Sequence, residues 1–286
     1  MRNWVKCAAI AASAAASVSC SAETPPPQTS ASAPQSDAPS ADLQARFVKA
    51  RDAYQAKDYA TATPLLVQLC DEDKYVQACP TAGQLVANGQ GVERDLEQAV
   101  ILFDIGCAGG LSDPCRYAAA VYEQSAPPMR SMEIAAKFED LACDLGDLVA
   151  CTKLGDLHMT GVGVERDADK AFAYATRGCG GGVAAACTDL GWLHEPFNTH
   201  PTKGPRADRA KAFDYYTSAC DMKDGRACSL LADKYEFGKE VAKDADKALE
   251  LYRLAISYNP EQWVINSAQG RIKVLEKAKA DAAAKQ

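Results

Sequence analysis

The stretch "CDLGDLVAC", from Cys143 to Cys151, is a short loop-like sequence with a cysteine at each end. Four more segments have this form, and the five pairs use ten of the twelve cysteines: "CDEDKYVQAC" (70–79), "CAGGLSDPC" (107–115), "CGGGVAAAC" (179–187) and "CDMKDGRAC" (220–228). The first cysteines of successive pairs lie 36 to 41 residues apart. A repeat of this length indicates stacked helix pairs, each of which packs on its neighbours.

Residues at fixed distances from the cysteines predict the second helix of each pair. A helix-capping residue stands twelve positions before each first cysteine, and a sixth unit without cysteines keeps it: Asp58, Asp95, Ser131, Asp167, Asp208 and Asp244. Such a side chain accepts a hydrogen bond from a first-turn amide, which is worth about 1 kcal/mol. An alanine follows four residues after each cap. We therefore expect a helix of about 12 residues in each unit, with the alanine at a close helix contact.

The cysteine pairs are placed to link one unit to the next. The first cysteine is expected to end one unit's second helix, and the second cysteine to begin the next unit's first helix. Facing helix ends can bring the Cα atoms near the roughly 5.5 Å that a disulfide needs, and each bridge contributes on the order of 2–3 kcal/mol. Zinc is the alternative, but zinc pairs normally enclose two to four residues. We predict the disulfides Cys70–Cys79, Cys107–Cys115, Cys143–Cys151, Cys179–Cys187 and Cys220–Cys228.

The N-terminal segment indicates an oxidising compartment. Residues 1–20, "MRNWVKCAAIAASAAASVSC", have a basic start and a run of small apolar residues, which predicts a secretory signal. Residues 21–41 form a Pro/Ser/Ala tether too polar to pack. Cleavage before Cys20 would make that cysteine the lipid attachment site of a bacterial lipoprotein, whereas cleavage after Ala22 would discard it. Both alternatives predict export, to the periplasm or outer membrane or by secretion.

Composition excludes two classes of partner. The formal net charge is −7, and no basic stripe or aromatic-basic motif is present, which argues against nucleic-acid binding. After the signal, no segment approaches the ~18 uninterrupted apolar residues of a transmembrane helix. We therefore expect membrane contact only through a lipid anchor, and we expect the exported chain to be a monomer.

The repeat resembles a known family. The segment "LGDLHMTGVGVERDADKAFAYATRGCGGGVAAAC" (154–187) resembles a Sel-one-like repeat, a relative of the tetratricopeptide repeat. The match covers about residues 79–258, where LG, GxGV, D-x-x-KA and C-x7-C recur in order. The cysteine pairs are similar to those of the Hcp-type cysteine-rich secreted proteins. Residues 42–70, which contain "RFVKARDAYQAKDYATATPLL", resemble a tetratricopeptide helix pair.

The resemblance implies an all-α fold, an αα-superhelix of about six stacked helix pairs, over residues 42–258. Residues 259–286 would supply a capping helix and tail, anchored by Trp263, Ile265, Val274 and Leu275. It also implies a non-catalytic scaffold that binds a protein or peptide on its inner face. The alternatives from other classes are a cell-wall or β-lactam-interacting protein and a regulator of an envelope or secretion system.

Motif searches give no catalytic residue, metal site or cofactor. Serine β-lactamase chemistry requires S-x-x-K and K-T-G, and neither occurs in the chain. The chain has three histidines and no H-x-x-x-H pair, which leaves no recognisable catalytic zinc site. We therefore predict that the protein is not an enzyme.

Four residues are candidates for binding. His158 and His194 occupy the same repeat position in successive units, and His200 and Phe197 belong to a longer loop at 195–207. The functional interpretation is a weak metal or pH-sensitive site beside a partner-binding loop. The alternative is that this repeat position favours a half-buried ring with a polar tip, because Tyr122 and Tyr235 occupy it elsewhere.

Overall fold

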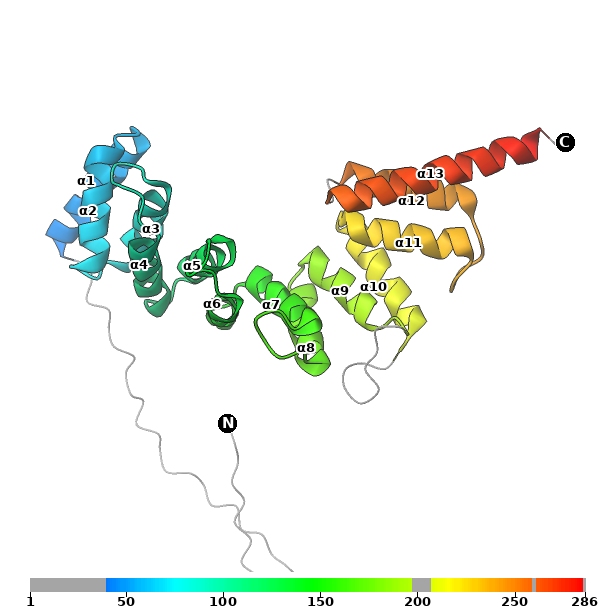
Figure 1. The fold of residues 1–286 in the computed structure, drawn as a ribbon, viewed down its shortest axis with the longest axis horizontal. Coiled ribbons are helices and arrows are strands. Elements are labelled where there is room, and N and C mark those ends of the chain that lie inside the picture. The colour runs from blue at the N-terminus through cyan, green and yellow to red at the C-terminus, as the bar shows by residue number, and fades with distance from the viewer. Residues whose placement is uncertain (1–39, 197–206, 259–260, 285–286) are drawn as a thin grey trace, which may run out of the picture. The chain divides into compact units, whose positions relative to one another are not determined.

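A computed structural model describes residues 40–196, 207–258 and 261–284. Within those residues the chain forms thirteen α-helices, one short 3-10 helix and no strand (Figure 1). The helices are α1 Ala41–Gln55, α2 Tyr59–Asp71, η1 Val76–Ala78, α3 Cys79–Asn88, α4 Leu96–Ala108, α5 Ser112–Gln124, α6 Met132–Asp144, α7 Leu148–Thr160, α8 Ala168–Gly180, α9 Ala184–Leu193, α10 Arg209–Asp221, α11 Gly225–Phe237, α12 Ala245–Ser257 and α13 Gln262–Ala283. The predicted all-α fold is confirmed.

The helices alternate between two roles. We call the odd-numbered helices the A helices and the even-numbered helices the B helices. Each helix packs against the next along the chain, and A helices also contact one another, as α7 does with α9 and α11 with α13. Figure 1 shows the successive hairpins following each other in chain order. Contacts between neighbours in this pattern define a solenoid.

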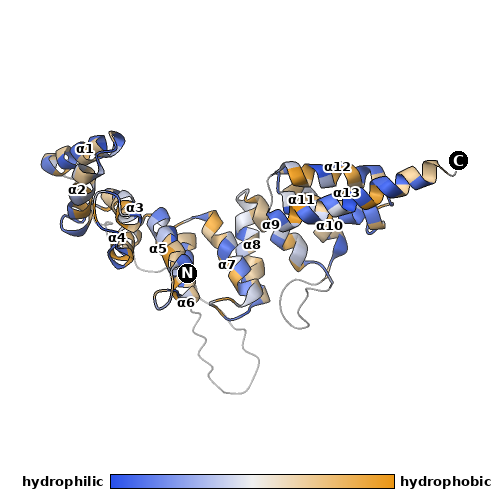
Figure 2. Ribbon diagram, turned by 45° about the horizontal axis from the view of Figure 1, so that its top comes forward, coloured by the Kyte–Doolittle hydropathy of each residue, from blue (hydrophilic) through white to orange (hydrophobic). Residues whose placement is uncertain are grey.

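The B helices begin where the sequence predicts. Each of the six predicted capping residues is the N-cap of a B helix and accepts a hydrogen bond from a first-turn amide. Asp95 accepts from the Gln98 amide at 2.9 Å, for example. The alanines four residues after the caps are fully buried. In Figure 2, hydrophilic and hydrophobic stretches alternate within the helices, as expected when one face of each helix is buried.

Five disulfides join the units, as predicted. Their Cα–Cα distances are 4.7–4.9 Å, and each links the last turns of a B helix to the first turn of the next A helix. Nine of the ten cysteines are buried, whereas Cys179 is partly exposed. The bridges therefore lie inside the joints between neighbouring helix pairs.

The last helix corrects one prediction. Helix α13 does pack on α12, but Trp263 and Val274 are 65% and 54% exposed and do not anchor it. The buried residues are Val264, Ala268 and Leu275. They follow the four- and seven-residue spacing of one helix face, which lies one position away from Trp263 and Val274. None of the helices in the described ranges is long and apolar enough to span a membrane.

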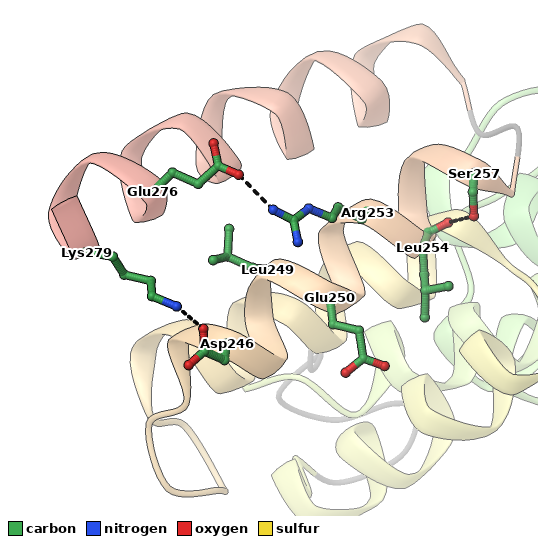
Figure 3. A pocket seen from close by; sticks show the side chains of 8 residues that line it. All are labelled: Asp246, Leu249, Glu250, Arg253, Leu254, Ser257, Glu276 and Lys279. Atoms are coloured by element: carbon green, nitrogen blue, oxygen red, sulfur yellow. Dashed lines mark hydrogen bonds and ion pairs between the residues drawn. The ribbon is translucent and has the colours of Figure 1, made fainter.

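A hollow of about 590 Å³ lies between α12 and α13 (Figure 3). Arg253 is paired with Glu276 at 2.8 Å, and Lys279 is paired with Asp246. In Figure 3, Leu249 lies between these two ion pairs. The charges bordering the hollow thus join α12 to α13.

Three sequence predictions lie outside the described residues. They are the signal at 1–20 with Cys20, nearly all of the tether at 21–41, and the loop residues Phe197 and His200. The division of the chain at these boundaries stays a prediction.

Candidate binding surface on the A helices

The A helices share one pattern of burial. Counted from the second cysteine of each joint, the residues three and four positions later are buried in all five A helices, and those six and seven positions later are buried except for Val121, Tyr122 and Tyr235. Positions two and five residues later are mostly half-buried, and the ninth is exposed where it falls on a helix. We call the residues at these positions the A-face, all of them at least partly accessible except the buried Asp189: Thr81, Gln84, Asn88, Tyr117, Ala120, Gln124, Lys153, Asp156, Thr160, Asp189, Trp192, Leu230, Asp233 and Phe237. Their spacing of three and seven residues places them on one side of each helix.

Charged pairs join successive A helices along this side. Lys153 on α7 contacts Glu123 on α5 at 3.2 Å. Arg116 on α5 contacts Asp147, the N-cap of α7, at 3.3 Å. Arg116 and Lys153 are partly exposed, so solvent screens each ion pair and limits its stabilisation to under about 1 kcal/mol. Their main effect is to surround the A-face with fixed charges.

The same arrangement continues toward the C-terminus. Arg271 on α13 pairs with Glu236 on α11, with Nε and Oε2 2.9 Å apart. Lys234 on α11 is buried and pairs with Glu195, which follows α9, and with Glu240 at 3.3 Å. Phe237 is 51% exposed, and Lys239 and Arg271 approach its ring at 5.5 and 5.0 Å from the centroid. An aromatic face with flanking cations is thus accessible at the end of α11.

Two carboxyl groups meet between α7 and α9. Asp156 and Asp189 lie close enough for each carboxyl group to affect the pKa of the other, and Asp189 is only 5% exposed. Burial and the neighbouring Asp156 carboxylate raise the pKa of Asp189 to about 8, although Arg226 opposes the rise. Burial likewise raises the pKa of Asp156. Two neighbouring carboxyl groups tend to keep one proton between them, because the two negative charges would repel each other.

A third buried carboxyl group lies one joint earlier. Glu139 on α6 occupies a core position that other B helices fill with Leu66, Phe103 or Ala175. Burial, followed by the negative charge of Glu123, raises the pKa of Glu139 to about 7. A carboxylate in an apolar core position lowers stability unless a proton or a cation neutralises it.

The structure does not bring the two histidines together as a pair. His158 stacks on Tyr174 of α8 at 5.8 Å, and His194 stacks on Tyr215 of α10 at 5.6 Å. His158 Nδ1 also lies 3.0 Å from the carbonyl oxygen of Glu165. Tyr122 makes the equivalent stack with Phe138. Among the described residues, no three His, Cys, Asp or Glu side chains are grouped to hold a metal ion. A binding role for these histidines stays a prediction.

Sequence reasoning missed Glu139 and the Asp156–Asp189 pair. A signal was present in the repeat alignment, because Glu139 stands at a position that is apolar in other units. Asp156 and Asp189 gave a weaker signal, since they fall at different positions of successive repeats, five and two residues after the cysteine. Only the packing of α7 beside α9 places them together.

These features define a class of protein, an all-α solenoid whose helix pairs are joined by disulfides. The family model of the Sel1 repeat matches residues 82–111, 148–183, 199–224 and 225–257. These segments of the chain match Sel1 repeats, as the sequence resemblance indicated. Sel1 repeats typically form scaffolds for protein–protein interaction.

Solved structures support the fold. A Sel1 repeat protein from Oxalobacter formigenes is 25% identical, with a TM-score of 0.64 over 80% of this chain and 86% of that chain. The protective antigen c5321 of uropathogenic Escherichia coli, which displays an SLR fold, is 23% identical, with a TM-score of 0.69 over 83% of this chain and 50% of that chain. Helicobacter pylori cysteine rich protein B also matches, at 23% identity and a TM-score of 0.36 over 48% of this chain and 96% of that chain.

Two curated relatives are cytochrome c oxidase assembly factors of Xenopus species. Cytochrome c oxidase assembly factor 7 of Xenopus tropicalis is 28% identical over 101 residues, 34% of this chain and 44% of that protein. The chain spans about half the length of the curated relatives it matches. The similarity therefore covers only part of each protein.

Proposed function

We propose that this protein is an exported, non-catalytic scaffold that holds a protein or peptide partner on its A-face. The observation that carries the proposal is the A-face itself, a recurring series of mostly accessible and mostly polar or aromatic side chains on the A helices. Most of these side chains are polar and lie beside the buried positions that form the core, although Tyr117 and Leu230 also pack against it. Rigid helices hold these side chains in fixed positions, which lowers the entropic cost of binding a partner.

Location in the periplasm or at the outer membrane fits this function. Five disulfides are typical of proteins that fold in an oxidising compartment. In our proposal the chain is held at the membrane by a lipid on Cys20, with residues 21–41 as the tether. Mass spectrometry of the mature N-terminus tests this point. A diacylated Cys20 supports the anchor, whereas a mature chain that begins at Glu23 contradicts it.

Site-specific photo-crosslinking in the native envelope tests the partner-binding surface. A photoreactive amino acid replaces an exposed A-face residue, Asn88, Gln124 or Thr160. Matched control positions are exposed on B helices, at Ile101, Lys137 and Asp214. We expect one or a few discrete crosslinked proteins from the A-face positions and none from the controls. Equal crosslinking from both sets would overturn the assignment of the surface.

A further inference from the structure

We propose that the Asp156–Asp189 pair is the receptor for a lysine or arginine side chain of the partner. The A-face would then bind an extended segment that carries basic residues. This inference rests on the proposed function, because it names the chemistry of the partner that the A-face holds.

The geometry of the pair leaves one acceptor free. Asp189 is 95% buried, and its Oδ2 has no hydrogen-bond partner among the described residues. Its other oxygen, Oδ1, lies 3.9 Å from Arg226, beyond normal hydrogen-bonding distance. A buried acceptor without a partner lowers stability, by about 1–3 kcal/mol in typical proteins. Asp156 is half-buried, so it is the member of the pair that a side chain from outside would contact first.

The charges around the pair are not balanced. Asp156 on α7, Arg226 and Asp224 at the start of α11, and Tyr216 on α10 surround Asp189. Arg226 is shared between Asp189 and Asp224, at 3.9 Å from each. The nearby Lys153 is already paired with Glu123. Three carboxyl groups thus share one guanidinium, and a further cation would complete the cluster.

A basic side chain is better suited than a metal ion to supply the missing positive charge beside the Asp156–Asp189 pair. Lysine and arginine donate several hydrogen bonds and accept none, which suits two carboxylates with a free oxygen. The described residues hold no group of three His, Cys, Asp or Glu side chains suited to a metal ion. The proton shared by the carboxyl groups is the species that the incoming cation would displace.

We call the Asp156–Asp189 pair the first acidic socket. A second acidic socket, formed by Glu139 and Glu123, lies one joint earlier. Glu139 is 7% exposed, and its Oε2 lacks a hydrogen-bond partner, as does Oε1 of Glu123. Packed helices lie about 8–10 Å apart, and an extended chain rises about 3.3 Å per residue. A partner segment crossing from one socket to the other therefore advances about three residues. The two sockets together fit basic residues at every third position.

A synthetic peptide tests this chemistry directly. The probe is a fluorescent peptide of about twelve residues, built from Ser, Ala and Gly with a lysine at every third position. Its control has the same sequence with glutamate in place of lysine. We expect the full mature protein to bind the lysine peptide in a fluorescence anisotropy titration at low salt, and not to bind the glutamate peptide. Equal binding of both peptides would overturn the proposal.

Variants locate the binding site. Asp156→Asn and Asp189→Asn each keep the shape of the side chain and remove the charge, so we expect each to weaken lysine-peptide binding about tenfold. Glu139→Gln tests the second socket with the same readout. Asp214→Asn is the matched control, since Asp214 is an exposed carboxylate on the B helix α10. If the control variant weakened binding as much as Asp189→Asn, general charge attraction would explain the result.

Stability and proton release separate a binding role from a structural one. We expect Asp189→Asn to unfold at the same or a higher urea concentration than the wild type at pH 8, while its peptide affinity falls. Titration calorimetry in two buffers with different ionisation enthalpies should show that peptide binding releases protons. A destabilised Asp189→Asn variant that binds the peptide normally, or binding without proton release, would contradict the proposal.

The outcomes distinguish this proposal from the proposed function. If crosslinking finds a partner on the A-face and the lysine peptide does not bind, the scaffold function stands and the basic-segment inference falls. If the lysine peptide binds through Asp156 and Asp189 while crosslinking finds its partner on the B helices, the socket chemistry stands and the A-face is wrong as the main interaction surface.

Discussion

The A-face has different chemistry in its two halves. On α3 and α5 it consists of uncharged residues: Thr81, Gln84, Asn88, Tyr117, Ala120 and Gln124. On α7, α9 and α11 it includes Lys153, Asp156, Asp189 and Asp233. Caps, buried alanines and disulfides are nevertheless the same in both halves. The comparison shows that the residues that build the joints are separate from those that face outward, so the surface can change without altering the fold.

Removing one disulfide from each half tests whether the joints are equivalent. The bridges Cys107–Cys115 and Cys220–Cys228 both span eight residues. We expect the double serine variants of the two bridges to lose similar stability, about 2–3 kcal/mol each, because the same loop-closure entropy is released in the unfolded chain. Urea unfolding followed by circular dichroism measures both. A loss confined to one bridge would show that the halves differ in their joints as well as in their surface.

Glycine-to-alanine changes compare the packing of the A helix on the B helix inside one unit of each half. A Cβ at Gly83 would lie 2.3 Å from Phe103, and one at Gly191 would lie 2.5 Å from Tyr216. We expect Gly83→Ala and Gly191→Ala to lose about 2 kcal/mol by overpacking, one in each half. At Gly155 the nearest atom would be 3.4 Å away. Gly155→Ala is the control and should be neutral or slightly stabilising in the same unfolding assay, because alanine favours helix.

The raised pKa of Asp189 predicts that folding stability depends on pH through a residue of the second half, on α9. Its pKa is about 8 in the folded protein and near 4 when unfolded. The folded state therefore holds the proton more tightly, and this stabilisation is complete below about pH 4 and is lost as the pH rises through about 8. We expect Asp189→Asn to remove this loss of stability. At pH 9 the free energy of unfolding of the variant should exceed that of the wild type by on the order of 1–2 kcal/mol.

The measurement is the urea midpoint at several pH values between 5 and 9. Asp104→Asn, on α4 in the first half, is the control and should follow the wild type at every pH, since Asp104 is exposed. If the wild type and Asp189→Asn had parallel profiles, Asp189 would not hold its proton in this range.

Helix caps should give the smallest effect, equal in the two halves. Asp95 caps α4 and Asp244 caps α12, each by accepting from first-turn amides near 3 Å. We expect Asp95→Ala and Asp244→Ala to lower stability by about 1 kcal/mol each, as measured by thermal unfolding. A much larger loss for one of them would indicate that this cap also holds a neighbouring unit in place.

The sequence predicted the parts of the fold that depend on nearby residues. The caps, the buried alanines and the cysteine pairs act within about a dozen residues, so their spacing alone indicates them. The capping helix was predicted, but the prediction that Trp263 and Val274 anchor it was wrong. Helix α13 has few apolar residues, so their spacing does not show clearly which face of the helix is buried. The Asp156–Asp189 pair joins helices that are two apart in the chain, and no local pattern reports how α7 lies beside α9.

The disulfides also bear on how the chain matures. Ten cysteines can pair in hundreds of ways, roughly, and a protein with interleaved bridges needs time or an isomerase to find the right set. Here the partner of each bridged cysteine is simply the adjacent bridged cysteine in the chain. An oxidase that couples thiols in the order in which they emerge from a translocation channel would produce every bridge correctly at the first attempt.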